Sequence, residues 1–181
     1  MAAYMGTIAL LFNFDRIFVR NFLTAQSGLY GALVTLGSVP NFFMGPLAFV
    51  LFPLAAARHA RGEDLRQTLD QVVITGLVTA GLGAVGFRLF GGWLLTLWKP
   101  AFAPAAHWLW LYGLGMGLHA TIEMVGNLEI ARHRYQSIWL VSLPTALLCA
   151  GLYLMRGFIT ITQLVVILVT TRALILGALW L

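Results

Sequence analysis

The sequence predicts an all-α polytopic membrane protein, a bundle of six transmembrane helices. Two properties lead to this prediction: 60% of the 181 residues are hydrophobic and only 9% are charged, and the mean hydropathy is +0.89. A soluble domain carries roughly 25% charged residues, because its surface faces water. The charged residues of this chain are too few for such a surface, whereas a surface that faces lipid needs none. Apolar runs of about 20 residues, the length that crosses a bilayer, divide the chain into spans.

The first two predicted spans cover residues 4–23 and 28–57. The second has about 30 residues without a charge, which at roughly 1.5 Å per residue exceeds the ~30 Å hydrocarbon core of a bilayer. It must therefore tilt, kink or continue along the interface. Pro40, Pro46 and Pro53 each remove a backbone hydrogen-bond donor, so we expect the helix to bend at one or more of them.

The later elements follow from breaks in the apolar pattern. The polar run at 58–66 is predicted to be a loop. The third span, 69–90, is rich in glycine, as expected where helices pack closely in lipid. Tryptophans and helix breakers at 91–104 predict an interfacial connection. The remaining predicted elements are spans at 105–131, 135–155 and 160–181 and a basic turn at 132–134.

The distribution of basic residues predicts the orientation in the membrane. Loops rich in lysine and arginine stay on the cytoplasmic side, and here these are the loops after the second and fourth spans. Their basic residues are Arg58, Arg61, Arg66, Arg132 and Arg134. The opposite side holds Lys99 and Arg156, with Arg88 at a helix end. We therefore expect one multi-pass domain, residues 1–181, in the cell (cytoplasmic) inner membrane, with both termini cytoplasmic.

Composition and motifs also exclude several function classes. The net charge of +5 would suggest nucleic acid as the partner of a soluble protein, but the basic residues lie between apolar runs and are better explained as topology signals. The chain lacks the motifs of serine hydrolases, zinc proteases and phosphate-binding loops. Its four histidines are scattered, so no metal site is expected. We expect neither an enzyme nor a protein that needs a cofactor.

A polar stripe on the first span is the richest candidate site. At about 100° per residue, Asn13, Arg16 and Arg20 fall within about 60° of one another. Arg16 and Arg20 could line a water-filled cavity and bind an anionic group, because guanidinium matches phosphate oxygens. Alternatively, Asp15 and one arginine form an interhelical ion pair, and Arg20 extends to the lipid headgroups. Asp15 points away from the stripe and needs a donor on another helix or at the cavity edge.

A second polar stripe lies on the fourth span. His119, Glu123 and Asn127 are spaced four residues apart and share one helix face. Glu123 could couple transport to a proton or sodium gradient, or it could be a packing residue that pairs with an arginine of another span. Arg172, in the middle of the last span, could line a cavity or pair with Asp15 or Glu123.

Several segments also share an order and a spacing with a known family. The segments are 13–19 (NFDRIFV), 28–32 (GLYGA), the proline-bearing second helix ending with 51–53 (LFP), and 95–106 (LTLWKPAFAPAA). Over most of the chain they resemble the start of a six-helix half in the polysaccharide and lipid-linked oligosaccharide flippases of the multidrug/oligosaccharidyl-lipid/polysaccharide exporter superfamily. Trp98 and Lys99 replace the phenylalanine and glycine that are usual in the last segment.

This resemblance implies an all-α bundle that forms one of two halves around a central cavity, which opens alternately to the two membrane faces. The implied substrate is an undecaprenyl-pyrophosphate-linked glycan, an anionic lipid. Arg16 is the residue that the motif best assigns to its pyrophosphate, with Asp15 beside it. The chain matches the C-terminal half, so we expect a longer chain, a split gene or a dimer to supply the second six-helix half.

Two other functions stay open at this stage. One is an ion-coupled multidrug-type efflux carrier of the same superfamily, in which Glu123 would be the coupling carboxylate. The other is a membrane scaffold without transport, in which Asp15, Arg16 and Arg172 bind neighbouring helices and nothing else.

Overall fold

The computed structural model describes residues 2–62, 66–131 and 136–180. These residues form helices joined by short turns, and no strand occurs among them, which confirms the all-α prediction. The α-helices are α1 (Ala2–Phe22), α2 (Ser27–Gly37), α3 (Val39–Ala60), α4 (Arg66–Trp98), α5 (Ala106–Ala131), α6 (Gln136–Leu154) and α7 (Ile161–Trp180). Two short 3₁₀ helices, η1 (Thr24–Gln26) and η2 (Pro100–Ala105), lie between them.

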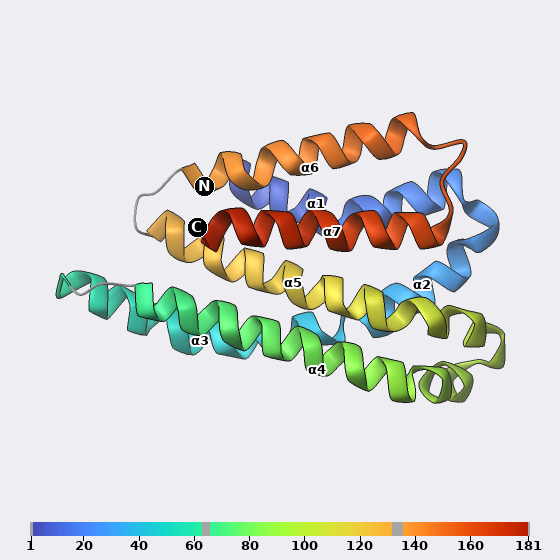
Figure 1. Cartoon of the computed structure of the whole chain (residues 1–181), viewed down its shortest axis with the longest axis horizontal. Coiled ribbons are helices and arrows are strands. Elements are labelled where there is room, and N and C mark those ends of the chain that lie inside the picture. Colours follow the sequence, from blue (N-terminus) through green and yellow to red (C-terminus); the bar gives the residue numbers. More distant parts are fainter. Residues whose placement is uncertain (1, 63–65, 132–135, 181) are drawn as a thin grey trace.

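The helices run side by side along one elongated bundle (Figure 1). α2 and α3 follow one another in the same direction, so together they traverse the bundle once. Both chain termini lie at the end of the bundle where α3 gives way to α4 (Figure 1). The chain therefore returns to the end from which it starts.

Helix α5 lies at the centre of the packing. It contacts α2, α3, α4 and α7, and its residues from Tyr112 to Ile130 are buried or half-buried. Side chains that α5 places in the core include Tyr112, Met116 and Ile122, each at most 1% exposed. Polar residues on α5 are consequently held between helices and kept from the outer surface.

Glycines allow α4 and α5 to approach closely. A Cβ atom at Gly117 would overlap Ala80 of α4, and one at Gly76 would overlap Thr121 of α5. Gly81, on the same helix as Gly76, has no heavy atom within 4 Å of the place where its Cβ would lie. The glycines of α4 thus divide into those that make a helix contact and those that do not.

The connection predicted for 91–104 is wrong over its first part. α4 continues through Gly91 and Gly92 and ends at Trp98, and η2 begins at Pro100. Gly91 is buried, and its Cβ would lie 3.0 Å from Leu109 of α5. The glycines therefore serve helix packing. The helix ends just before Pro100, because proline has no backbone N–H to donate to the helix.

The long second apolar run is interrupted just before its first proline. α2 ends at Gly37 and α3 begins at Val39, whereas Pro46 and Pro53 lie inside α3. Ser38 fills the break and donates its hydroxyl to the carbonyl of Val34, with an O···O distance of 2.6 Å. The break lies here because Pro40 has no backbone N–H to donate to the carbonyl of Leu36, so the helical hydrogen-bond ladder cannot continue across it.

The first basic loop, predicted at 58–66, is shorter than predicted. α3 extends to Ala60 and α4 begins at Arg66, with Gly62 in a left-handed turn at φ 71°. The basic turn with Arg132, His133 and Arg134 lies outside the described residues.

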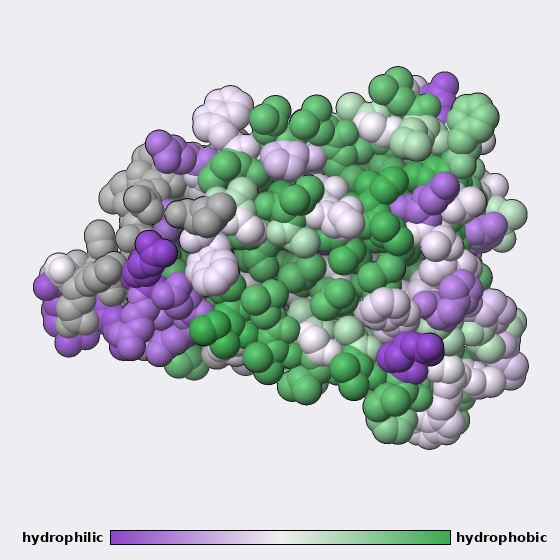
Figure 2. Space-filling model, in the orientation of Figure 1, coloured by the Kyte–Doolittle hydropathy of each residue, from purple (hydrophilic) through white to green (hydrophobic). Residues whose placement is uncertain are grey.

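Within the part of the chain that the structure describes, three helices, α4, α6 and α7, are long and apolar enough to cross a membrane. Apolar side chains also cover the middle of the face seen in Figure 2, and hydrophilic ones gather toward its two ends. Exposed apolar residues of α4 include Ile74, Leu77, Val78, Leu82, Val85 and Leu89. These features are compatible with a membrane protein, and the count of six spans stays a prediction.

The α4–α5 contact makes a testable prediction for Gly117. In Gly117→Ala the new Cβ would lie 2.6 Å from the Cα of Ala80, so the helices must separate, and we expect a loss of about 1–3 kcal/mol in stability. Thermal unfolding of the purified protein measures this loss. Gly81→Ala is the matched control, because it adds the same methyl group where no atom is close. Equal unfolding temperatures for the two variants would contradict the close contact.

Candidate functional site

Of the two acidic residues that the sequence singles out, Asp15 and Glu123, Asp15 is the more deeply buried. Its side chain is 0% exposed, and its Oδ2 atom accepts hydrogen bonds from the hydroxyls of Tyr30, at 2.7 Å, and Tyr112, at 2.9 Å. The two rings pack edge to face with centroids 5.9 Å apart. A carboxylate from α1 is thus shared by donors on α2 and α5, and it fixes the relative positions of three helices.

Arg172 is also completely buried. Its guanidinium donates to the carbonyl of Leu11 at 3.0 Å and to the sulfur of Met116 at 3.7 Å. Gly115 makes room for it, because a Cβ there would lie 3.2 Å from Nη1. Among the described residues neither Asp15 nor another carboxylate is within ion-pair distance of Arg172, which instead links α7 to α1 and α5. The structure places this residue in the core.

Arg16, next to Asp15 in the sequence, is half-buried and faces the break between α2 and α3. Its guanidinium donates to Asn13 Oδ1 at 3.4 Å and to Ser38 Oγ at 3.5 Å. It also lies over the ring of Phe12, 4.4 Å from the centroid. Both hydrogen bonds of the two Nη atoms are long, and Nε is buried without a partner. The cation therefore retains donor capacity for another acceptor.

Arg20, which belongs to the same predicted stripe, lies in a different environment. It is exposed in the last turn of α1. The stripe therefore splits into a half-buried part, Asn13 with Arg16, and an exposed end at Arg20. This position allows the guanidinium to reach lipid headgroups, one of the alternatives that the sequence left open.

His119 connects the two predicted stripes. Its ring is 1% exposed and packs against Phe12, with centroids 5.2 Å apart. The ring of Phe12 also contacts the guanidinium of Arg16. Nδ1 of His119 is buried without a hydrogen-bond partner. The Phe12 ring thus bridges a cation on α1 and an imidazole on α5.

A pocket of about 320 Å³ lies between α3 and α5. Its polar lining residues are Asn41, Glu123 and Asn127. The side-chain oxygens of Asn41 and Asn127 are buried and accept no hydrogen bond. Glu123 is half-buried, and its carboxylate has no hydrogen bond or ion pair with any described residue. The pocket is therefore rich in oxygen acceptors that lack donors.

We call these half-buried and buried polar side chains along α1, α3 and α5 the polar seam. Its members are Asn13, Arg16, Ser38, Asn41, Glu123 and Asn127. Arg16 contacts Ser38, and the backbone N–H of Asn41 donates to the Ser38 carbonyl at 3.0 Å. The break between α2 and α3 therefore joins the cationic part of the seam to its acidic part.

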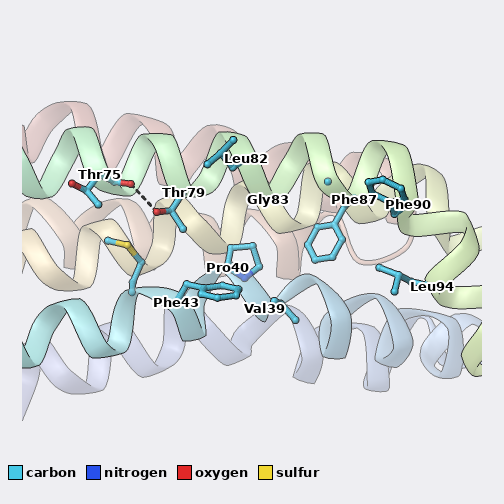
Figure 3. A pocket seen from close by; sticks show the side chains of 12 residues that line it. Val39, Pro40, Phe43, Thr75, Thr79, Leu82, Gly83, Phe87, Phe90 and Leu94 are labelled. Atoms are coloured by element: carbon cyan, nitrogen blue, oxygen red, sulfur yellow. Dashed lines mark hydrogen bonds between the residues drawn. The ribbon is translucent and has the colours of Figure 1, made fainter.

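A second, apolar pocket of about 630 Å³ opens between α3 and α4. Figure 3 shows Pro40 and Phe43 on one side and Leu82 and Phe87 on the other. Gly83 faces Pro40, and a Cβ there would lie 2.8 Å from the proline ring. The proline at the start of α3 therefore helps to shape this pocket, which we call the α3–α4 groove.

Sequence reasoning missed several members of this site. The tyrosines that hold Asp15 lie on other helices, and an apolar helix gives no signal for such a pairing. Asn41 did carry a signal, because it is a polar amide directly after Pro40 within a long uncharged run. The α3–α4 groove depends on how the helices separate and has no motif.

Comparison with models of known protein families, with curated proteins and with solved structures finds no match for this chain. The resemblance to flippases therefore stays a prediction. The chemistry of the site rests on the residues and contacts described above.

The tyrosine pair around Asp15 leads to a second prediction. Tyr112→Phe removes one of two donors from a buried carboxylate, so we expect a loss of about 1–3 kcal/mol in stability. Tyr153→Phe, at an exposed tyrosine, is the control and should have little effect. In an Asp15→Ala background, Tyr112→Phe should cost less than in the native chain. Purely additive effects in this double-mutant cycle would show that the hydrogen bond contributes nothing.

Proposed function

We propose that this chain is one six-span half of a membrane transporter that flips a lipid-linked glycan carrying an anionic pyrophosphate. The substrate would cross from the inner to the outer leaflet of the cell membrane by alternating access. A second six-helix half, from a longer chain, a separate gene product or another copy, would complete the cavity. The partners are therefore the lipid-linked glycan, membrane lipid and the second half.

The environment of the Arg16 guanidinium is the observation that carries this proposal. Arg16 is half-buried on α1 between apolar helices, its two hydrogen bonds are long, and its Nε lacks a partner. A cation placed in a membrane interior is costly, so it marks a functional site by default. Guanidinium binds phosphate oxygens through two parallel hydrogen bonds. Pyrophosphate is therefore a ligand that could replace the two long hydrogen bonds of Nη1 and Nη2.

The charge distribution along the bundle supports the proposed orientation. Arg58, Arg61 and Arg66 flank the α3–α4 connection, and both termini lie at that end of the bundle (Figure 1). Under the positive-inside rule this end is cytoplasmic. The six traverses of the bundle then correspond to the six proposed spans.

The apolar lining of the α3–α4 groove favours a substrate with a lipid chain. It is lined almost entirely by apolar side chains, and both the groove and Arg16 adjoin the break between α2 and α3. An amphipathic lipid could therefore place its pyrophosphate at Arg16 and part of its polyprenyl chain in the groove. Its volume of about 630 Å³ corresponds to a segment of such a chain.

An ion-coupled efflux carrier is the second candidate, and the unpaired carboxylate of Glu123 favours it. A loss of gradient dependence in Glu123→Gln, measured by drug resistance, would favour this function. The scaffold alternative is supported by Asp15 and Arg172, which are buried among protein partners. It gives no account of the free donors on Arg16.

The proposed function predicts the effect of changing Arg16. In Arg16→Ala we expect binding of a polyprenyl pyrophosphate to the purified chain to weaken at least about tenfold, because a charge-assisted hydrogen bond contributes about 1.5–3 kcal/mol. Arg16→Lys keeps the charge without the planar fork and should give an intermediate loss. Calorimetric titration measures the affinity.

Arg88→Ala is the matched control, because Arg88 is an exposed arginine on α4, away from the polar seam. Glycan export in cells should follow the same order, while each variant stays in the membrane. Native affinity and full export in Arg16→Ala would refute the role of Arg16.

A further inference from the structure

The turn between α6 and α7 presents an arginine at the end of the bundle away from the chain termini (Figure 1). The backbone N–H of Phe158 donates to the Met155 carbonyl at 2.9 Å, which closes the turn around Arg156. Ile159, directly after the turn, is 5% exposed and belongs to the hydrophobic core. The backbone at Arg156 is therefore held in place, although its side chain is exposed.

Two aromatic rings from different helices orient the guanidinium of Arg156. It lies over the ring of Tyr153 on α6, 4.5 Å from the centroid, and 5.8 Å from the centroid of Phe22 on α1. The two rings meet edge to face at 78°, with centroids 6.1 Å apart, so they form a corner for the cation. Among the described residues the guanidinium has no hydrogen bond and no ion pair. Because a cation–π contact uses none of its N–H groups, these donors are available to an external acceptor.

The charges at this end of the bundle favour an anionic partner. Arg20, in the last turn of α1, and Lys99, just before η2, are exposed cations at the same end. No exposed carboxylate lies there among the described residues. The described acidic residues are buried in the core or lie toward the chain termini, and they are Asp15, Asp70, Glu123 and Glu129. An anion that binds at this end therefore meets attraction without a competing acid.

An exposed arginine at the opposite end is used differently. Arg61 donates its Nε–H to the Ala57 carbonyl at 3.2 Å, within its own helix end. Lys99, at the same end as Arg156, instead lies 5.6 Å from the centroid of the Phe102 ring. Cations beside aromatic rings are typical of the level of the lipid headgroups in a membrane. The pattern at this end thus indicates contact with headgroups.

Exposed apolar side chains on both sides of Arg156 point to the same environment. Leu154 is 80% exposed and Phe158 is 90% exposed. Water disfavours such large apolar groups, whereas the acyl region of a bilayer accommodates them. A guanidinium beside them can then reach the level of the phosphates, which it binds through paired hydrogen bonds.

We propose that Arg156 is a binding site for the phosphate of an anionic phospholipid, with Tyr153 and Phe22 as the residues that position its guanidinium. The acyl chains of the lipid lie beside Leu154 and Phe158. A zwitterionic lipid binds less well, because its ammonium group finds no carboxylate at this end. The site depends on the α6–α7 turn and the end of α1, and it does not rest on the proposed transport function.

The test is calorimetric titration of a short-chain phosphatidylglycerol into the purified full chain in a neutral detergent, compared with phosphatidylcholine of equal chain length. The native chain should bind phosphatidylglycerol more tightly. In Arg156→Gln the affinity for phosphatidylglycerol should fall at least about tenfold. Arg156→Lys keeps the charge without the planar fork and should give an intermediate loss. Because the side chain is exposed, the unfolding temperature of these variants without lipid should equal that of the native chain.

Matched variants separate an oriented site from a general attraction to positive charge. Arg61→Gln removes the same charge at the opposite end and should leave the affinity unchanged. Tyr153→Leu removes the ring beside the guanidinium and should weaken binding, whereas Tyr153→Phe keeps the ring and should not. Equal losses in Arg61→Gln and Arg156→Gln, or equal affinities of the native chain for the two lipids, would overturn the proposal.

Two further titrations identify the ligand and the site. Glycerophosphoglycerol is the same headgroup without acyl chains, and an affinity equal to that of phosphatidylglycerol would show a site for soluble anions and refute a lipid site. Binding of phosphatidylglycerol that persists in Arg16→Ala supports a site separate from the proposed substrate site. Loss in Arg16→Ala with retention in Arg156→Gln would overturn the lipid site and leave the role of Arg16 intact. Failure of polyprenyl pyrophosphate to bind, with phosphatidylglycerol still bound, counts against the flippase alone.

Discussion

The shared hydrogen bonds of Asp15 are the interaction on which the rest of the arrangement depends. A carboxylate buried in a medium of low polarity needs strong donors. Although Oδ1 is buried without a partner, Tyr30 and Tyr112 supply two such donors to Oδ2 from α2 and α5. This contact fixes the rotation of α1. Because successive side chains on a helix differ by about 100°, placing Asp15 toward the tyrosines turns Arg16 toward Ser38 at the break between α2 and α3. A buried acid therefore determines where a usable cation is presented.

The central position of α5 organises the other half of the site. Small residues such as Gly117 let α4 approach, and the face toward α1 and α3 carries His119, Glu123 and Asn127. Since α5 is surrounded by other helices, polar groups on it escape lipid and can line an internal space. Arg172 joins the same core through the Leu11 carbonyl and the Met116 sulfur, while its Nε is buried without a hydrogen-bond partner.

The sequence predicts features that depend on a single helix, but not contacts between helices that are far apart in the sequence. Apolar length and breaker residues located most helix ends to within about three residues, except the end of α4 and the break between α2 and α3. The spacing of His119 and Glu123 placed them on one face, because such spacing is a property of a single helix. Contacts between helices could not be predicted: Tyr112 lies 97 residues from Asp15. The extension of α4 to Trp98 was missed for the same reason, since Gly91 is explained by its packing on α5 and not by its neighbours in the sequence.

The central claim is that the polar seam faces water inside the membrane. Labelling of single cysteines by a charged, water-soluble maleimide in membranes that hold the protein tests it, in a Cys149→Ser background that removes the native thiol. The claim predicts that Asn13→Cys and Asn127→Cys react, whereas Leu82→Cys on the apolar face of α4 does not. Seam positions as unreactive as Leu82→Cys would contradict it.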